Sequence, residues 1–341
     1  MFRLIYDVDI LTEYFCLFLK TKIDYGPNEA SNDCDLSEDA SFIKKIFLSD
    51  GTNNRSSEII YTGVADGVGS WKEYGVDPRE FSHSLMQECE NLLREADADA
   101  KSISTTHGKD SELLQKMLTP AELMAKAMDR VKADNIIGSS TACIAMFDGL
   151  RHQLHFSNLG DSGIIVLRHI DSDVAGVLKR DKVTPRSERT SDLRVAFVSQ
   201  QQLRSFNHPF QLGWTGEELG DEEVSSFKTA AESCTTSIHI RRGDIIIMAT
   251  DGLFDNVELE DITKIALSWE QKNGFINGGD IASREKRWKK GMSMTLESAD
   301  QINSLAELLV AKARENSLDQ STDSPFAILA KENDIMWSGG K

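Results

Sequence analysis

Three short segments of this chain each place an aspartate where an apolar, strand-like run ends in a glycine turn. They are residues 64–69 (VADGVG), 159–163 (LGDSG) and 249–255 (ATDGLFD), and their acids are Asp66, Asp161, Asp251 and Asp255. The segments lie far apart along the chain, so only tertiary folding can bring the carboxylates together. Buried carboxylates repel one another and are costly to desolvate, and bound cations offset that cost. The pattern therefore indicates a metal-dependent hydrolase.

The types of residue in these segments suit hard divalent cations. Mg²⁺ and Mn²⁺ take oxygen ligands, keep several waters and need only a few carboxylates from the protein. Asp66 and Asp251 are each followed by glycine, which lets the backbone approach an ion closely. A single aspartate at a glycine turn is usually only a turn residue, but three such segments in strand-end contexts indicate a site. The histidines have no pair at zinc spacing and the chain has no P-loop motif, so we expect Mn²⁺ or Mg²⁺.

The charge balance limits the partners that the protein can have. The formal net charge is −17, from 38 basic and 55 acidic residues. Nucleic acids and anionic membranes both require an excess of basic residues, so we expect neither as a partner. The five cysteines are widely spaced without a C-x-x-C pair, which favours an intracellular, reducing compartment. We expect a monomer.

The first twenty residues are apolar but carry Asp7, Asp9 and Glu13. Their apolar stretches are too short for a membrane span, and the acids fit neither a signal peptide nor a transit peptide. Leu4, Val8, Leu11 and Phe15 follow helical spacing instead. We therefore expect an amphipathic helix in an N-terminal extension over residues 1–30.

Apolar periodicity gives a coarse map of the remaining elements. Strands are predicted at 40–48, 58–65, 140–148, 152–158 and 163–169, the last three as an antiparallel meander, and at 236–240 and 245–250 as a hairpin. Helices are predicted from Pro78, at 113–131, at 258–272 and at 299–316, and a surface loop at 180–192. Strands interrupted by helices, without regular βαβ alternation, indicate an α+β fold whose sheets are covered by helices.

Six motifs in order along the chain closely resemble those of the metal-dependent (PPM, or type 2C) serine/threonine protein phosphatases. They are ADGVGSW (65–71), GSSTACIAMFD (138–148), NLGDSG (158–163), FNHPFQL (206–212), GDIIIMATDGLFDN (243–256) and SPFAILAKENDIMWSGGK (324–341). The valine in ADGVG and the FN-PFQL segment are shared with the branch that includes mitochondrial and plastid members. The resemblance implies a phosphatase domain over 31–341 with an insertion at 273–295, and it implies one of those organelles as the compartment.

The resemblance also implies a fold, a metal centre and a reaction. The fold would be an antiparallel β-sandwich between helical layers (α-β-β-α), with two Mn²⁺ or Mg²⁺ ions at one end. Asp66 would bridge both ions, the Gly67 carbonyl would bind one of them, and Asp251 would bind the other. A metal-bridging hydroxide would then attack phosphoserine or phosphothreonine in line, which makes Asp66 and Asp251 the catalytic aspartates and phosphoproteins the substrates.

Further acidic residues match the family's secondary positions. Asp161 and Asp255 match positions that hold a third ion in some members. Glu38 and Asp39 match an early acidic pair, one member of which faces metal-bound water, and we count Glu38 among the metal-site residues.

The sequence also departs from the family pattern. Val68 stands where the wider family has a histidine, and residues 32–35 lack the family's phosphate-binding arginine. Relatives continue after GGK with an Asp-Asp pair and a last strand, whereas this sequence stops at Lys341. We therefore expect weak or no activity from the chain as written. One alternative is a pseudophosphatase that only binds, and another is a hydrolase of small phosphate esters.

Overall fold

Long strands form two sheets that pack face to face in the computed structural model, which describes residues 15–18, 37–49, 56–103, 117–149, 151–171, 191–216, 227–241, 243–273 and 296–341. The larger sheet has five strands in the order β12-β6-β5-β3-β2, and all its neighbours are antiparallel. Its members are β2 (Asp39–Ser49), β3 (Ser56–Asp66), β5 (Ala142–Asp148), β6 (Gln153–Leu159) and β12 (Cys234–His239).

The second sheet has four strands in the order β1-β13-β7-β8, of which only β1 runs parallel to its neighbour. Its members are β1 (Phe15–Phe18), β7 (Gly163–Asp171), β8 (Ser191–Val198) and β13 (Ile245–Ala249). Two small ribbons complete the strands: β4 (Gly138–Ser140) pairs with β11 (Leu212–Trp214), and β9 (Leu203–Ser205) pairs with β10 (His208–Pro209).

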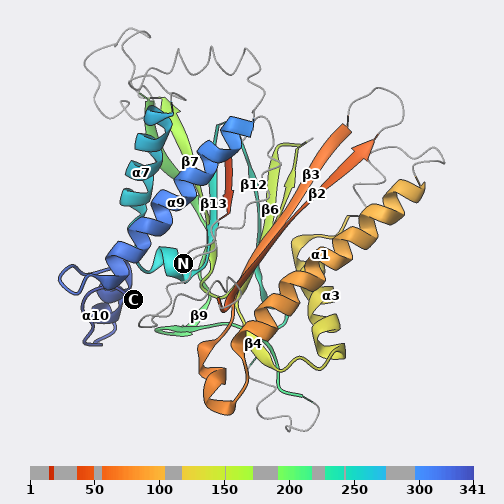
Figure 1. The fold of residues 1–341 in the computed structure, drawn as a ribbon, viewed down its shortest axis with the longest axis horizontal. Coiled ribbons are helices and arrows are strands. Elements are labelled where there is room, and N and C mark those ends of the chain that lie inside the picture. Colours follow the sequence, from red (N-terminus) through yellow and green to blue (C-terminus); the bar gives the residue numbers. More distant parts are fainter. Residues whose placement is uncertain are drawn as a thin grey trace.

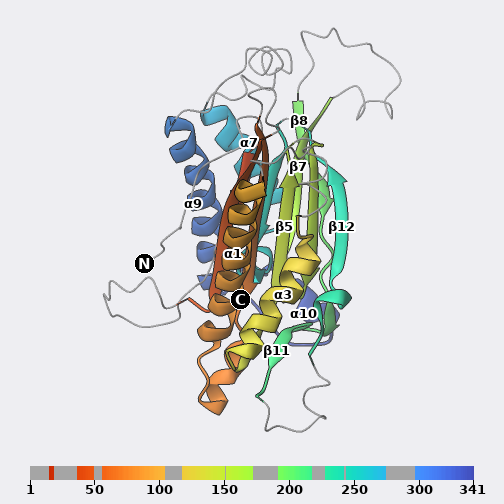
Figure 2. The ribbon, with the colours of Figure 1, turned by 90° about the vertical axis from the view of Figure 1, so that its right-hand side faces the viewer.

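Helices cover the outer faces of both sheets (Figure 1). On the five-stranded sheet lie α1 (Pro78–Ile103) and α3 (Pro120–Ala133), and on the four-stranded sheet lie α7 (Leu259–Lys272) and α9 (Leu296–Leu318). The short elements are η1 (Gly69–Tyr74), η4 (Ala230–Glu232), α6 (Asp251–Phe254) and α10 (Pro325–Glu332). Figure 2 shows α1, α9 and strands of the two sheets running in roughly the same direction.

The core divides into layers that follow the pleat of the strands. Along β13, Ile245 and Ile247 pack in the cluster shared with α7 and α9, whereas Ile246 and Met248 pack in the cluster between the two sheets. Because alternate side chains of a strand point to opposite faces, a strand buried on both faces must be apolar throughout. This explains the uninterrupted run 245–249 (IIIMA) and confirms the predicted four-layer α+β sandwich.

Two predicted strand pairings are wrong. The expected hairpin over 236–250 does not form, because β12 and β13 belong to different sheets. The expected meander is also split, since β5 and β6 pair with each other while β7 joins β13 in the other sheet. Apolar periodicity shows that a strand is buried but not which strand lies beside it.

The prediction of an N-terminal helix is wrong for its last residues. The described residues of that segment, Phe15–Phe18, form a strand that pairs with β13, and the remainder of the predicted helix lies outside the described residues. Helix α3 begins at Pro120, later than predicted. The predicted loop at 180–192 includes the first residues of β8, while its other residues and the insertion from 274 to 295 lie outside the described part of the chain.

Among the described helices, none combines the length and the apolar character that crossing a membrane requires.

Candidate active site

The predicted aspartates lie at one end of the sandwich. Strand β3 ends at Asp66, Asp161 lies between β6 and β7, and Asp251 begins α6 directly after β13. Because β13 and β7 are antiparallel, the end of one lies beside the start of the other. Asp66 is likewise paired with Asp39, the first residue of β2. Antiparallel pairing thus gathers acids from remote parts of the chain.

Thr141, which the sequence analysis did not single out, joins these strand ends. Its amide donates to the Asp66 carbonyl at 3.0 Å, and its hydroxyl accepts from the Asp66 amide at 3.2 Å. The same hydroxyl lies 2.9 Å from that of Ser162. Its methyl group contacts Gly160, whose φ of +111° favours glycine, and an added Cβ there would lie 2.6 Å from that methyl carbon. The only signal in the sequence is a polar residue directly before an apolar strand.

The carboxylates are close enough to perturb one another. Burial, followed by the charges of Asp39, Asp251 and Asp161, raises the pKa of Asp66 well above its ordinary value, although its side chain keeps part of its surface open to solvent. Burial and then the charge of Asp251 raise the pKa of Asp161 to about 7 and that of Asp255 to about 6. A bound cation would relieve this concentration of negative charge.

A lysine ammonium lies among these acids. Lys341 Nζ donates to Asp251 Oδ2 at 2.5 Å and to Asp255 Oδ2 at 2.6 Å. The Lys341 amide donates to the Asn256 side chain at 2.9 Å, and its ammonium lies 4.7 Å from the centre of the Phe326 ring. Lys341 ends the motif at 324–341, but nothing in that motif indicates that its ammonium contacts the acids.

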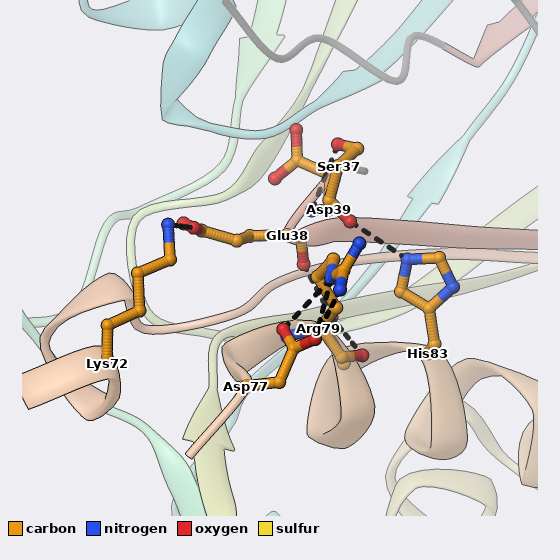
Figure 3. A network of polar contacts seen from close by, with 8 residues as sticks. Ser37, Glu38, Asp39, Lys72, Asp77, Arg79 and His83 are labelled. Carbon is orange, nitrogen blue, oxygen red and sulfur yellow. Dashed lines mark hydrogen bonds and ion pairs between the residues drawn. The ribbon is translucent and has the colours of Figure 1, made fainter. Parts of the chain in front are cut away.

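The two residues of the early acidic pair, Glu38 and Asp39, lie in different environments (Figure 3). Asp39 is buried, and the Thr250 hydroxyl donates to its carboxylate at 3.5 Å. Glu38 instead reaches away from Asp39 to form an ion pair with Lys72 of η1. The structure thus places Asp39, rather than the side chain of Glu38, beside Asp66.

Gly67 fits a position that is closed to larger residues. Its amide donates to the Glu38 carbonyl at 3.1 Å. A Cβ added to Gly67 would lie 2.3 Å from the Pro78 carbonyl oxygen, too close for any other residue without a backbone shift. The glycine after the first aspartate is therefore required for this strand end to meet the start of α1.

The donor set fits hard divalent cations, because it consists of carboxylate oxygens and already surrounds one positive group, the Lys341 ammonium. Within the described ranges, no three His, Cys, Asp or Glu side chains stand at the mutual spacing of a ready-made metal site. The acids are close enough for their charges to raise one another's pKa, and the Lys341 ammonium lies between two of them, which agrees with their more open spacing. A cation at Asp251 Oδ2 would thus compete with the Lys341 ammonium.

Known proteins resemble this chain over most of its length. The human "Protein phosphatase PTC7 homolog" is 32% identical over 293 residues, which are 84% of this chain and 73% of that protein. The Danio rerio protein of the same name is 32% identical over 307 residues, which are 89% of this chain and 77% of that protein. No protein-family model matches the sequence.

A solved structure, that of the photosystem II phosphatase PBCP, shares the fold. The TM-score is 0.51 at 23% identity, and the match covers 87% of this chain and 79% of that one. This likeness shows the fold, and the curated relatives show the family. The chain belongs to the metal-dependent (PPM, or type 2C) serine/threonine protein phosphatases, as its motifs predicted.

Proposed function

We propose that this protein hydrolyses phosphoserine and phosphothreonine in phosphoproteins, using two Mn²⁺ or Mg²⁺ ions. The observation that carries the proposal is the convergence of Asp66, Asp161 and Asp251 at one end of the sandwich, where burial and mutual charge raise the pKa of Asp66 and Asp161. Such clusters of perturbed carboxylates mark functional sites more often than structural ones. We further propose that Asp66, Gly67 and Asp251 hold the ions, and that Asp161 and Asp255 contribute to a third position.

The bound ions and the protein's own residues would have different roles in the reaction. When bound, the ions would supply a hydroxide at neutral pH and neutralise phosphate oxygens. Asp66 and Asp251 would hold that positive charge at the end of β3 and the start of α6. Thr141 would keep the Asp66 backbone fixed through its hydrogen bonds, so that the carboxylate needs little reorganisation on binding.

Turnover of a phosphopeptide in the presence of Mn²⁺ tests the proposal. We expect hydrolysis by the wild-type chain, and Asp66→Asn and Asp251→Asn should each lower kcat at least about 100-fold, as loss of a main electrostatic group does. Asp129→Asn, an exposed acid on α3, is the matched control and should leave the rate unchanged. Variants as active as the wild type would contradict the proposed site.

The same assay separates the alternatives. A pseudophosphatase would bind Mn²⁺ without turnover, and a hydrolase of small molecules would cleave small aryl phosphates far faster than phosphopeptides. The human and Danio rerio relatives that match this chain are named as phosphatases, which favours turnover over binding alone.

We propose in addition that the phosphatase domain spans 31–341 with an insertion at 273–295, and that residues 1–30 are an extension whose strand β1 joins the four-stranded sheet. We also propose that the protein acts as a monomer in a mitochondrion or plastid. The support is the family branch to which its motifs belong, together with the wide coverage of the relatives. Light scattering on the purified chain and imaging of a fluorescent fusion test the oligomeric state and the compartment. A dimer or a cytosolic signal would contradict them.

A further inference from the structure

Exposed large apolar side chains are concentrated in one stretch of the described residues. Helix α10 and the segment after it carry five of the nine, which are Ile328, Leu329, Ile335, Met336 and Trp337. The Ile335 amide donates to the Ala330 carbonyl at 2.9 Å, so the segment lies against the end of α10. Apolar groups that are exposed together often mark a binding site. We call residues 335–337 the apolar segment.

Helix α10 is attached to the acidic cluster. The Phe326 amide, in the first turn of the helix, donates to the Asp255 carbonyl at 3.1 Å. The centre of the Phe326 ring lies 4.7 Å from the Lys341 ammonium, which pairs with Asp251 and Asp255. The surface that α10 carries is therefore continuous with the proposed metal site.

Phe326 is packed between two other aromatic rings. The centre of its ring lies 5.2 Å from that of Trp337 and 4.9 Å from that of Phe206. Phe206 comes from the turn between β9 and β10, and Gln201, just before β9, donates from its side chain to the Asp161 carbonyl at 3.2 Å. Segments from two sides of the acidic cluster thus meet at Phe326, and Trp337 extends this aromatic cluster to the surface.

Trp337 is held in place although it is 43% exposed. Its indole N–H donates to the Gly340 carbonyl at 3.1 Å, and its ring packs edge-on against Phe326. A ring that is already held loses little conformational entropy when a ligand binds to it. Met336 beside it is 99% exposed, and a flexible thioether adapts to apolar groups of different shape. Together they suit one large apolar side chain of a partner.

The charges nearby indicate which partner fits. Glu332 and Asp334 are exposed next to the apolar segment, and the chain carries a net charge of −17. Two copies of the chain would bring these acids against one another, which opposes self-association. A substrate polypeptide has no such obstacle, and it must pass this end of the sandwich for its phosphate to reach the aspartates.

The distance from the acids to Trp337 is within the reach of a peptide bound at the site. Lys341 Nζ lies 2.5 Å from Asp251 Oδ2 and 4.7 Å from the centre of the Phe326 ring. The centre of the Trp337 ring lies 5.2 Å from that of Phe326. An extended chain advances about 3.3 Å per residue, so about four residues span these contacts.

We propose that Trp337 and Met336 bind a large apolar side chain of the substrate, within about four residues of the phosphorylated serine or threonine. The proposal rests on the proposed function and names its substrates more closely, as phosphoproteins with a large apolar residue near the phosphorylated one. Trp337 and Met336 are then residues that determine specificity and take no part in the chemistry.

Two phosphothreonine peptides test the proposal. They carry either leucine or alanine at the second and third places on each side of the phosphothreonine and are otherwise the same. With Mn²⁺ present, the wild type should have a kcat/KM about tenfold higher for the leucine peptide, the low end of what an apolar contact gives. Trp337→Ala should lower this ratio to about one and Met336→Ala to about three. Trp337→Phe, which keeps a ring, should retain most of it.

Leu308→Ala is the matched control, because Leu308 is 44% exposed on α9 and is not part of the apolar segment. It should keep the tenfold ratio of the wild type. Met336 is 99% exposed, so its replacement leaves the packing of the protein undisturbed and tests the segment even if Trp337→Ala fails to fold.

Three results would overturn the proposal. The first is a ratio near one in the wild type, and the second is an unchanged ratio in both Met336→Ala and Trp337→Ala. In the second case, equal losses with the two peptides in Trp337→Ala would mean that Trp337 only supports α10. The third is a dimer in light scattering that Met336→Ala dissociates, which would make the segment a self-association surface.

Failure of the proposed function is a separate outcome. If the wild type binds Mn²⁺ but hydrolyses neither peptide, the proposed function fails. Fluorescence anisotropy with the two dye-labelled peptides and the Mn²⁺-loaded chain then tests the segment. About tenfold tighter binding of the leucine peptide, lost in Trp337→Ala and Met336→Ala, would support the proposal. Equal binding of the two peptides by the wild type would overturn it.

Discussion

Replacing Lys341 by methionine removes a cation from the acidic cluster and keeps much of its apolar stem. The ammonium contacts Asp251 and Asp255 at 2.5 and 2.6 Å, and the three side chains are only 25%, 19% and 16% exposed. Breaking a buried ion pair costs about 3–5 kcal/mol, and an exposed pair contributes about 0–1 kcal/mol. For this partly shielded contact we expect a loss of about 2 kcal/mol in the free energy of unfolding without metal.

The metal-free protein should therefore melt earlier. With an unfolding entropy of about 2.1 cal/mol/K per residue over 341 residues, a loss of about 2 kcal/mol lowers Tm in EDTA by about 3 °C. Lys331→Met is the matched control, because Lys331 pairs with Asp323 in the same part of the chain and is 48% exposed. That control should leave both Tm and Mn²⁺ affinity unchanged.

The effect on metal binding has the opposite sign. The ammonium occupies Asp251 Oδ2, so its contact with the acid competes with a divalent ion for that oxygen and opposes metal binding. Lys341→Met should therefore bind Mn²⁺ at least about tenfold more tightly, since each 1.4 kcal/mol is a factor of ten. Lys341→Arg, which keeps the charge, should behave like the wild type. Weaker Mn²⁺ binding in Lys341→Met, or an unchanged Tm in EDTA, would refute the reasoning.

Other consequences follow from the same geometry. Asp39→Asn should weaken Mn²⁺ binding about 10–100-fold. Glu38→Gln should weaken it much less, because only Asp39 is buried beside the cluster. Equal losses of Mn²⁺ affinity in the two variants, measured by calorimetry, would contradict this expectation. Gly67→Ala should destabilise the fold by about 1–3 kcal/mol. Gly69→Ala should not, because its added Cβ would meet only the end of the Glu38 side chain, at 3.3 Å. Denaturant unfolding of the two variants compares their free energies of unfolding. The raised pKa of Asp161, about 7, contributes stability that is present below its unfolded pKa of about 4 and is lost as pH rises through 7. Tm in EDTA should thus fall between pH 4 and 7 more steeply in the wild type than in Asp161→Asn, and equal slopes would count against the assignment.

The fold class and the gathering of acids could be predicted from the sequence. Apolar runs that end in Asp-Gly mark strand ends, and antiparallel pairing brings the end of one strand beside the start of another, as Asp66 and Asp39 show. Strand partners could not be predicted, because alternation reports burial rather than neighbours. That is why β12 and β13 looked like a hairpin although they lie in different sheets.

Residues that act through tertiary contacts were invisible in the sequence. Thr141 acquires its role only because Asp66 and Ser162 come beside it in the fold. Lys341 ends a motif, but its contacts with Asp251 and Asp255 arise only in the fold, because those acids lie far away in the sequence. The four apolar residues of β1 fit a helix or a strand equally well, because so short a run has no decisive period.

Titration of the metal-free chain with Mn²⁺ in a calorimeter tests the central idea most directly, namely that aspartates from separate strands form one cation site. The account predicts saturable uptake of about two ions per chain and its loss in Asp66→Asn and Asp251→Asn. No uptake by the folded wild type, or uptake that both variants retain, would contradict it.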